Sequence, residues 1–386
     1  MKVPLLDLRP TLEELRDEIV DAVTKVVDST RYIMGPEIDG LESEISAYCG
    51  TTDAVGVSSG TDALLLSLMV LDVAPGDLVL TSNFSFFATA GVVARLNATP
   101  VFVDIDLETF NIDPESLRKT LTDMDAETRK RVKAIIPVHL YGQCADMAAI
   151  LAISKEFEIP VIEDGAQAIG AECEIDGKKR SAGSLGDFGC FSFFPSKNLG
   201  CLGDGGIVTI NNTEWADLLR LKRVHGGERK YYHRVIGGNF RLDPIQATVV
   251  RVKLPHLNNW HLQRQNNADH YNKLFAEAAL EDKIRIPFVE HSQTLQNPHI
   301  YNQYVIRAER RDELQSFLAE NEIASEVYYP LPFHLQECFL HLGGKEGDFP
   351  VSEVAANEVL ALPVYPGMTV EMRETVVEHI VQFYQS

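Results

Sequence analysis

The sequence predicts an α/β fold with two units: a large unit built on a mainly parallel sheet with helices on both faces, and a smaller α+β unit. Two observations support this. Short apolar runs alternate with stretches of helical spacing as far as residue 242, as in strand–helix–strand units. A long helical stretch then leads away, broken at Pro255, and shorter mixed elements follow it. We therefore expect one domain over residues 1–242 and another over 243–386.

The chain starts with two predicted helices. Thr11 and Glu14 form a capping-box pattern, after which apolar residues recur at helical spacing to Val26. A second helix is expected from about Ile38 and ends near Gly50. The following apolar runs predict strands at 53–57, 78–82, 100–105, 134–140, 159–164, 190–194 and 206–210, with helices at 61–71, 86–96, 114–121, 145–157 and 213–222. In the C-terminal unit we expect strands near 303–308 and 323–329 and helices near 310–320, 351–361 and 369–384.

Composition excludes several classes of function. The formal net charge is −21, so the surface repels phosphate polymers and no nucleic-acid partner is expected. No apolar run is long enough to span a bilayer and the N-terminus has no signal layout, which predicts a cytoplasmic protein without a membrane partner. The six cysteines are scattered without a C-x-x-C pair, so we expect reduced thiols packed as small apolar side chains, and no metal site.

Candidate site residues follow the strands, because ligands of open α/β sheets bind beyond the carboxyl ends of their strands. The run at 53–57 is followed by Ser58-Ser59-Gly60-Thr61 and a predicted helix. Gly60 lets the backbone approach a ligand, the free amides of a helix N-terminus attract an anion, and the Thr61 hydroxyl adds a donor. Simple helix capping is the alternative for this turn.

Two further strands end in residues that suit one aromatic cofactor. The run at 159–164 ends in Asp164, which can hold a positive charge, and Gln167 lies about one helical turn later. A helix N-cap is the alternative for Asp164. The run at 190–194 is followed by Lys197, in a turn that contains a proline and a glycine. When partly desolvated, such an amine can be neutral and nucleophilic, as Schiff-base chemistry requires, whereas a solvated surface lysine is the alternative.

Together these three strand ends match the needs of pyridoxal phosphate. A phosphate cup anchors the cofactor, an acid keeps the pyridine nitrogen protonated so that the ring withdraws electrons, and a lysine forms the imine. Asp164 and Lys197 suit the last two roles. Ser192 can add a hydrogen bond to the phosphate, and Phe86, which follows another strand, can stack on the ring.

With these residues the chain resembles the DegT/DnrJ/EryC1/StrS aminotransferases, fold-type I pyridoxal-phosphate enzymes that mostly aminate keto groups of nucleotide-linked sugars. The likeness covers nearly the whole chain. Its specific motifs are SSGTDAL, FSFFAT, EDGAQAIGA, SFFPSKNLG with GDGG, and GGNFRLDPIQA.

The resemblance implies a role for each candidate residue. Lys197 is expected to bind the cofactor covalently, Asp164 to pair with the pyridinium nitrogen, and Gln167 to hydrogen-bond the ring hydroxyl. Beside Gly60, the remaining cofactor contacts are expected at Thr61, Asp62 and Ser192 for the phosphate and at Phe86 for the ring face.

The GGNFRLD motif implies a contact between subunits. By resemblance, Asn239 reaches the phosphate of the neighbouring subunit's cofactor, with Arg241 as the competing candidate. A two-fold homodimer with shared active sites, which is a common closed symmetry, is therefore expected. A structural loop is the alternative for both residues.

The substrate is inferred from a basic segment and its surroundings. The chain around residues 225–260 is most similar to family members that act on 3-keto sugars linked to thymidine or uridine diphosphate. Residues 222–234 carry five positive side chains against Glu228 alone, net +4, which suits a diphosphate bound near Arg229 and Lys230. Pairing of these charges with acidic neighbours is the alternative.

Three further residues bear on the sugar. Several 3-keto-sugar members have a tyrosine where this chain has Phe194, which indicates a different sugar configuration or a different hydrogen-bond partner. Tyr329 and His334 lie in a stretch similar to the family's substrate-facing segment and are candidate sugar contacts. A satisfied, partly buried histidine is the alternative for His334.

We expect a ping-pong transamination with glutamate as the amino donor. Lys197 is displaced by the donor and then moves a proton between the donor's α-carbon and the cofactor's aldehyde carbon. The reverse sequence aminates the keto sugar at position 3, with a 4-keto sugar as the alternative. A sugar dehydratase of this fold would have histidine in place of Lys197, and a non-catalytic regulator would show a broken catalytic set or an added DNA-binding segment.

Overall fold

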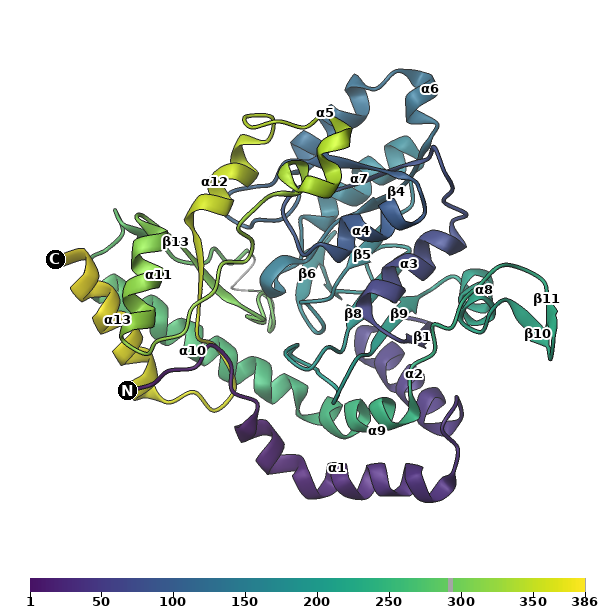
Figure 1. Cartoon of the computed structure of the whole chain (residues 1–386), viewed down its shortest axis with the longest axis horizontal. Coiled ribbons are helices and arrows are strands. Elements are labelled where there is room, and N and C mark those ends of the chain that lie inside the picture. Colours follow the sequence, from purple (N-terminus) through teal and green to yellow (C-terminus); the bar gives the residue numbers. More distant parts are fainter. Residues whose placement is uncertain (291–293, 386) are drawn as a thin grey trace.

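A twisted sheet lies at the centre of the large unit in the computed structural model, which describes residues 1–290 and 294–385 (Figure 1). Two hydrogen-bonded groups of strands are joined where isolated bridges link β4 to β5. The resulting order is β1 (Asp53–Val57), β9 (Gly206–Ile210), β8 (Phe188–Ser192), β5 (Ile162–Asp164), β4 (Val132–Ile136), β2 (Leu78–Ser82) and β3 (Thr99–Val103).

The predicted mainly parallel sheet is confirmed. β9 is antiparallel to both β1 and β8, whereas β5 pairs in parallel with β8, and β2 pairs in parallel with β3 and β4. Parallel neighbours end at the same edge of the sheet, so the residues that follow β5 and β8 are brought together.

Apolar side chains alternate between the two faces of the sheet, as period-2 strands require. Val55 and Val57 pack on the face covered by helices α3 (Gly60–Val70), α4 (Ala88–Arg95) and α8 (Thr213–Arg223). Ala54, the residue before Val55, packs on the opposite face. That face is covered by α2 (Pro36–Cys49), α5 (Pro114–Asp123), α7 (Met147–Phe157) and α9 (Pro244–Lys253).

The helical stretch after residue 243 leads to a smaller lobe (Figure 1). It is interrupted as predicted: α9 gives way to a 3₁₀ turn, Leu254–His256, before α10 (Leu257–Ala278). The lobe contains an antiparallel sheet of β12 (Ile284–Arg285), β13 (Tyr304–Ala308) and β14 (Val359–Leu362), together with α11 (Arg311–Glu320), α12 (Pro350–Glu358) and α13 (Val370–Gln385).

Three local predictions are wrong. Helix α1 (Arg9–Ser29) starts before Thr11, whose hydroxyl donates back to the Leu8 carbonyl, so no capping box forms. The stretch 323–329 makes isolated bridges rather than a strand. Residues 359–361, predicted as the end of a helix, form β14 because they pair with β13.

The division at residue 242 stays a prediction, but the first residues do not follow it. Val3 forms a bridge with Ile323 and lies in the buried core of the C-terminal lobe. The N-terminal strand-like segment therefore packs with the lobe, although α1 packs against α9 of the large unit.

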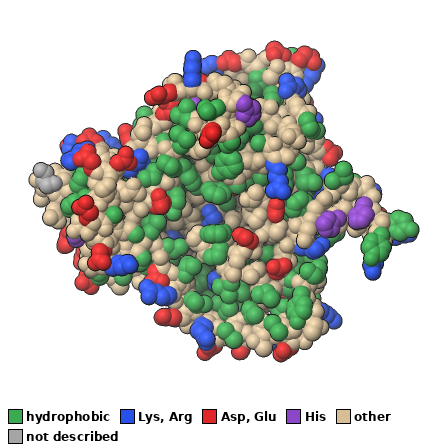
Figure 2. Space-filling model, in the orientation of Figure 1, with side chains coloured by type: hydrophobic (Ala, Val, Ile, Leu, Met, Phe, Trp, Pro, Cys, Tyr) green, Lys and Arg blue, Asp and Glu red, His purple; other side chains and the backbone are tan. Residues whose placement is uncertain are grey.

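Two hairpins escaped the sequence analysis. β6 (Glu172–Ile175) and β7 (Lys178–Ser181) form one, and β10 (Gly227–Arg229) and β11 (Tyr232–His233) form the other. The second hairpin follows α8 and stands clear of the body at the right of Figures 1 and 2. The remaining short elements are α6 (Ala126–Arg129) and 3₁₀ turns at Leu140–Gly142, Phe333–Leu335 and Glu337–Leu342.

Among the helices in the described part of the chain, none is long and apolar enough to cross a membrane. Within the same residues there is no group of three or more His, Cys, Asp or Glu side chains arranged to hold a metal ion.

Candidate active site

Asp164 and Lys197 meet at the carboxyl ends of two neighbouring parallel strands. Asp164 is the last residue of β5 and pairs in register with Cys190 of β8. Lys197 follows β8 in a turn in which its backbone N–H donates to the Phe194 carbonyl at 2.9 Å. The predicted convergence of these two strand ends is what the structure shows.

The lysine turn is held firmly on both sides. A side chain at Gly200 would come within 2.5 Å of the Pro195 carbonyl oxygen, so the turn requires glycine there. Asn198, which is buried, donates to the Ile300 carbonyl at 3.0 Å and accepts from Asn302 at 2.9 Å. The C-terminal lobe thereby fixes the backbone next to Lys197.

Burial sets the electrostatics of this pair. Desolvation lowers the pKa of Lys197 from 10.5 to about 8, and the nearby Asp164 charge opposes that change. Desolvation also raises the pKa of Asp164, while hydrogen bonds from Thr89 and Ala166 and the charge of Lys197 oppose it. The lysine amine makes no hydrogen bond with the described residues, so it is available as a nucleophile near neutral pH.

The turn after β1 forms an anion cup. At Gly60 an added side chain would lie 2.7 Å from Ser192 Cβ, so glycine brings the start of α3 against the end of β8. No described residue accepts a hydrogen bond from the backbone N–H groups of Gly60 and Thr61, and the Thr61 hydroxyl is likewise unengaged. The Ser192 hydroxyl accepts only a long bond, 3.3 Å, from Phe194 N–H. A phosphate fits this set of donors.

Asp62 serves the cup indirectly. Its backbone N–H donates to the Ser59 hydroxyl at 3.0 Å, which caps α3, and its carboxylate accepts from the Ser58 hydroxyl at 2.6 Å. An anionic side chain would repel phosphate, so this geometry favours a role in shaping the turn. Capping and anion binding, treated as alternatives from the sequence, therefore occur in the same turn.

Gln167 and the aromatic residues close the other side of the site. Gln167 accepts from the Tyr141 N–H at 2.7 Å and donates to the Tyr329 hydroxyl at 3.1 Å. Phe86 is 58% exposed, and its ring centroid lies 6.3 Å from that of Tyr329. The exposed Phe86 ring can cover a planar ligand, and the second amide hydrogen and lone pair of Gln167 are left to meet a ring hydroxyl.

His334 does not face the site as a free side chain. It is 2% exposed, and its ring nitrogens lie 2.8 Å from the Asn83 amide nitrogen and 3.0 Å from a Glu353 carboxylate oxygen. The prediction of a sugar contact is therefore corrected in favour of its alternative, a satisfied buried histidine. Phe194, in contrast, is 52% exposed beside the lysine turn.

The basic segment 222–234 is mostly neutralised. Lys222 and Arg223 are buried and pair with Asp72 and Glu42, both distant in sequence. Arg234 pairs with Glu228 at 2.7 Å across the β10–β11 hairpin. The prediction that residues 222–234 offer an unpaired net charge of +4 is therefore wrong. Of the five basic side chains, Arg229 and Lys230 stay exposed at the hairpin.

Asn239 and Arg241 differ in their surroundings. Asn239 is exposed and joins Val224 by a backbone bridge. Arg241 bridges Val57 of its own chain, next to the anion cup, and its buried Nε has no hydrogen-bond partner among the described residues. Of the two, Asn239 is the one presented outward.

Thr89 is a site residue that the sequence reasoning missed. It is fully buried in the first turn of α4, and its hydroxyl donates to Asp164 at 2.7 Å. The signal that could have found it is the FSFFAT motif, in which only Phe86 was assigned a role.

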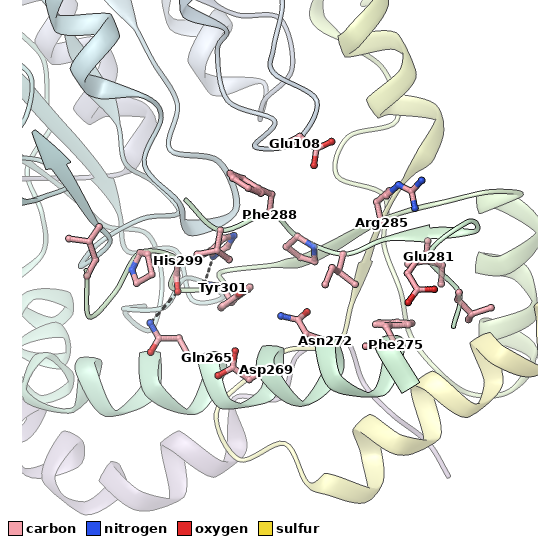
Figure 3. Close-up of a pocket in the computed structure, with 18 of the residues that line it drawn as sticks. Glu108, Gln265, Asp269, Asn272, Phe275, Glu281, Arg285, Phe288, His299 and Tyr301 are labelled. Atoms are coloured by element: carbon pink, nitrogen blue, oxygen red, sulfur yellow. Dashed lines mark hydrogen bonds between the residues drawn. The ribbon is translucent and has the colours of Figure 1, made fainter. Parts of the chain in front are cut away.

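A cavity of about 750 Å³ lies apart from this site. Figure 3 shows Asp269, Asn272 and Phe275 projecting into it from α10, with Arg285 and His299 opposite. Its lining, as far as the structure describes it, contains none of the predicted site residues.

Comparison with known proteins identifies a family and several relatives of this chain. Residues 13–381 match the DegT/DnrJ/EryC1/StrS aminotransferase family. A "Pleiotropic regulatory protein" of Geobacillus stearothermophilus is 48% identical over 100% of this chain and 99% of its own length. A UDP-N-acetyl-3-dehydro-alpha-D-glucosamine 3-aminotransferase of Acidithiobacillus ferrooxidans is 40% identical, covering 98% of this chain and 96% of its own.

Solved structures agree with the family match. DesV of S. venezuelae, in complex with a ketimine intermediate, superposes with a TM-score of 0.91 at 37% identity, covering 100% of this chain and 99% of that one. NtdA of Bacillus subtilis, with bound cofactor PMP, gives a TM-score of 0.89 at 28% identity, covering 100% and 86%.

Proposed function

The chain belongs to the DegT/DnrJ/EryC1/StrS aminotransferase family, and from this premise we propose that it transfers an amino group from glutamate to a keto sugar linked to a nucleoside diphosphate. The observation that carries the proposal is the placement of partly buried Lys197 beside buried Asp164 at the ends of adjacent parallel strands. The cofactor of such an enzyme is pyridoxal phosphate.

The residues present fit this cofactor. The N–H groups of Gly60 and Thr61 with the hydroxyls of Thr61 and Ser192 would hold the phosphate, and the exposed Phe86 ring would cover the pyridine ring. Asp164 would hold a proton on the ring nitrogen. When bound, pyridoxal phosphate supplies an electron-withdrawing ring that stabilises negative charge on a substrate carbon.

Lys197 performs two tasks in this proposal. Its amine, with a pKa lowered by burial to about 8, is neutral in roughly a tenth of the molecules at pH 7, far more than for an ordinary lysine, and can bind the cofactor covalently. Once the donor has displaced it, the same Nζ atom can take the proton from the donor's α-carbon and deliver it to the carbon of the cofactor's aldehyde group. A histidine at this position, as in a dehydratase, could not do the first task.

The sugar is proposed to carry its ketone at position 3. The relative from Acidithiobacillus ferrooxidans is named for amination at that position, and it covers nearly the whole chain. Arg229 and Lys230, left exposed at the hairpin, and Tyr329, beside Gln167, are the proposed substrate contacts. A 4-keto sugar remains the alternative.

A two-fold homodimer is part of the proposal. The β10–β11 hairpin exposes Tyr231 (82%), Tyr232 (73%) and nearby Ile236 (84%), more apolar surface than a projecting hairpin normally leaves to water. Figure 2 shows further apolar side chains gathered low on the face, where Figure 1 places α1. A second copy that covers these surfaces would bring Asn239 to its partner's cofactor phosphate.

A cytoplasmic location completes the proposal. The six cysteines are all free in the structure, which suits a reducing compartment. A purely regulatory role, in the sense of the name of the relative from Geobacillus stearothermophilus, has no need of the retained Lys197 and Asp164 pair.

The test compares 3-keto and 4-keto hexoses, each with and without the nucleoside diphosphate, with glutamate as donor and products followed by mass spectrometry. The proposal predicts fastest turnover of the 3-keto nucleotide sugar, because binding energy from the remote diphosphate orients the ketone. Equal turnover of the free sugar would contradict the proposed role of the diphosphate. If none of the four compounds is aminated, the proposed function is wrong.

A further inference from the structure

The side chain of Thr89 connects two walls of the cofactor site. Its Oγ lies 2.7 Å from Asp164 Oδ2, 3.1 Å from the Phe86 carbonyl oxygen and 3.3 Å from Ser85 Oγ. Phe86 belongs to the wall that covers the ring face, and Asp164 to the wall that faces the ring nitrogen. Thr89 itself has 0% exposure, so no water competes for its hydroxyl.

The single hydroxyl proton has one preferred acceptor. The carboxylate oxygen is the nearest of the three atoms, and a hydrogen bond to a charged acceptor is about twice as strong as one to a neutral carbonyl. Ser85, which is 4% exposed, can then donate to the Thr89 oxygen. The proton chain therefore runs from Ser85 to Thr89 to Asp164.

We propose that Thr89 is a positioning residue for the cofactor's ring nitrogen, acting through Asp164: it keeps this carboxylate ionised, orients it, and ties it to the Phe86 segment. The inference rests on the proposed function, since it needs pyridoxal phosphate at Lys197.

Burial makes such a donor necessary. A carboxyl group that is 5% exposed favours its neutral form, and a neutral acid cannot hold the proton on a pyridine nitrogen. The charge of Lys197 opposes this effect, but the amine that carries the charge is the one that would bind the cofactor. Among the residues that the structure describes, the donors that remain on the carboxylate are the Thr89 hydroxyl and the Ala166 N–H at 3.2 Å.

His139, the other titratable group whose charge would favour ionised Asp164, is engaged elsewhere. Its Nδ1 accepts from Ala145 N–H at 3.1 Å and its Nε2 faces Glu163 at 2.9 Å, with both side chains fully buried. Both ring nitrogens of His139 are thus occupied by other partners, and neither of them is hydrogen-bonded to Asp164.

The experiment compares variants loaded with ring-¹⁵N-labelled pyridoxal phosphate. Thr89→Val keeps the shape and removes the hydroxyl, Thr89→Ala removes it with a smaller side chain, and Thr89→Ser restores it. Thr81→Val is the matched control, because Thr81 is equally buried but donates to the Ile136 carbonyl, away from the cofactor. The ¹⁵N shift reports protonation of the ring nitrogen without any turnover.

In Thr89→Val and Thr89→Ala the ring nitrogen should lose its proton about one pH unit lower than in the wild type, and the cofactor's dissociation constant should rise about tenfold. Thr89→Ser should stay close to the wild type. Thr81→Val should lose thermal stability without moving either value.

Two outcomes separate this inference from the proposed function. If the wild type binds the labelled cofactor at Lys197 but both hydroxyl-free variants titrate like it, Thr89 is merely structural and the inference is wrong. If the wild type itself does not bind pyridoxal phosphate, the proposed function fails first.

Discussion

Predicted site residues lie in two regions, at the ends of strands β5 and β8 and at the β10–β11 hairpin. The charged side chains of these two regions have different surroundings. Asp164 and Lys197 are neighbours because two strands pair in parallel and end at the same edge. The two basic side chains before the hairpin pair with residues distant in the sequence, as Arg223 does with Glu42 on α2. Within the hairpin, Arg229 and Lys230 stay exposed. Position at a strand end is a property of the backbone topology, whereas the freedom of a charge depends on whichever side chain packs against it.

The first prediction separates the two regions by stability. Arg223→Ala should lower the free energy of unfolding by about 3 kcal/mol, because buried Glu42 loses its close partner and keeps the longer pair with Arg220 at 3.6 Å. Arg229→Ala, at an exposed position, should change it by about 0.5 kcal/mol or less. Urea unfolding of both variants measures the difference. A small loss of stability in Arg223→Ala, together with a raised Michaelis constant for the nucleotide sugar, would contradict this and indicate that Arg223 binds the substrate.

The second prediction concerns Asp164. Asp164→Asn should keep the fold but slow the glutamate half-reaction on the order of 100-fold or more, because the ring nitrogen loses its charged partner. The control is Asp187→Asn, which keeps an acceptor for the Val161 N–H and lies outside the site. Stopped-flow absorbance of the bound cofactor follows the reaction. An unimpaired half-reaction in Asp164→Asn would contradict the assigned role.

The third prediction is a pH dependence. Because burial lowers the pKa of Lys197 to about 8, the free amine is scarce below pH 8 and dominant above it. Capture of pyridoxal phosphate by the cofactor-free protein should therefore accelerate roughly tenfold per pH unit up to about pH 8 and then level off. An ordinary lysine, with a pKa of 10.5, would keep accelerating well beyond that point. A rate that still climbs at pH 9.5 would show that the amine is not desolvated.

The smallest expected effect is at Phe194. Since this side chain is 52% exposed, Phe194→Tyr should alter the free energy of unfolding by about 0.5 kcal/mol or less. What should change is the preference between 3-keto sugars that differ in configuration, measured as a ratio of kcat/KM values. An unchanged ratio would mean that the hydroxyl absent here has no part in sugar recognition.

These regions also show how far the sequence could lead. Strands β1, β2 and β9 were predicted with their bounds, and the residues that follow β5 and β8 with them, since local apolar patterns and turn residues determine both. The burial of His334 between Asn83 and Glu353 could not be predicted, because those partners lie far away in the chain. For the same reason the role of Thr89 could not be predicted, since its partner Asp164 lies far away in the chain.

The central claim is that Lys197 carries the cofactor, and borohydride reduction followed by peptide mapping tests it most directly. The reduced cofactor should be found on the single peptide that contains Lys197, and the Lys197→Ala protein should retain none. Lys253 provides the internal comparison, because burial also lowers its pKa, but its amine is bound to the Gly200 carbonyl at 2.6 Å. Label on Lys253, or on any lysine other than Lys197, would contradict the account.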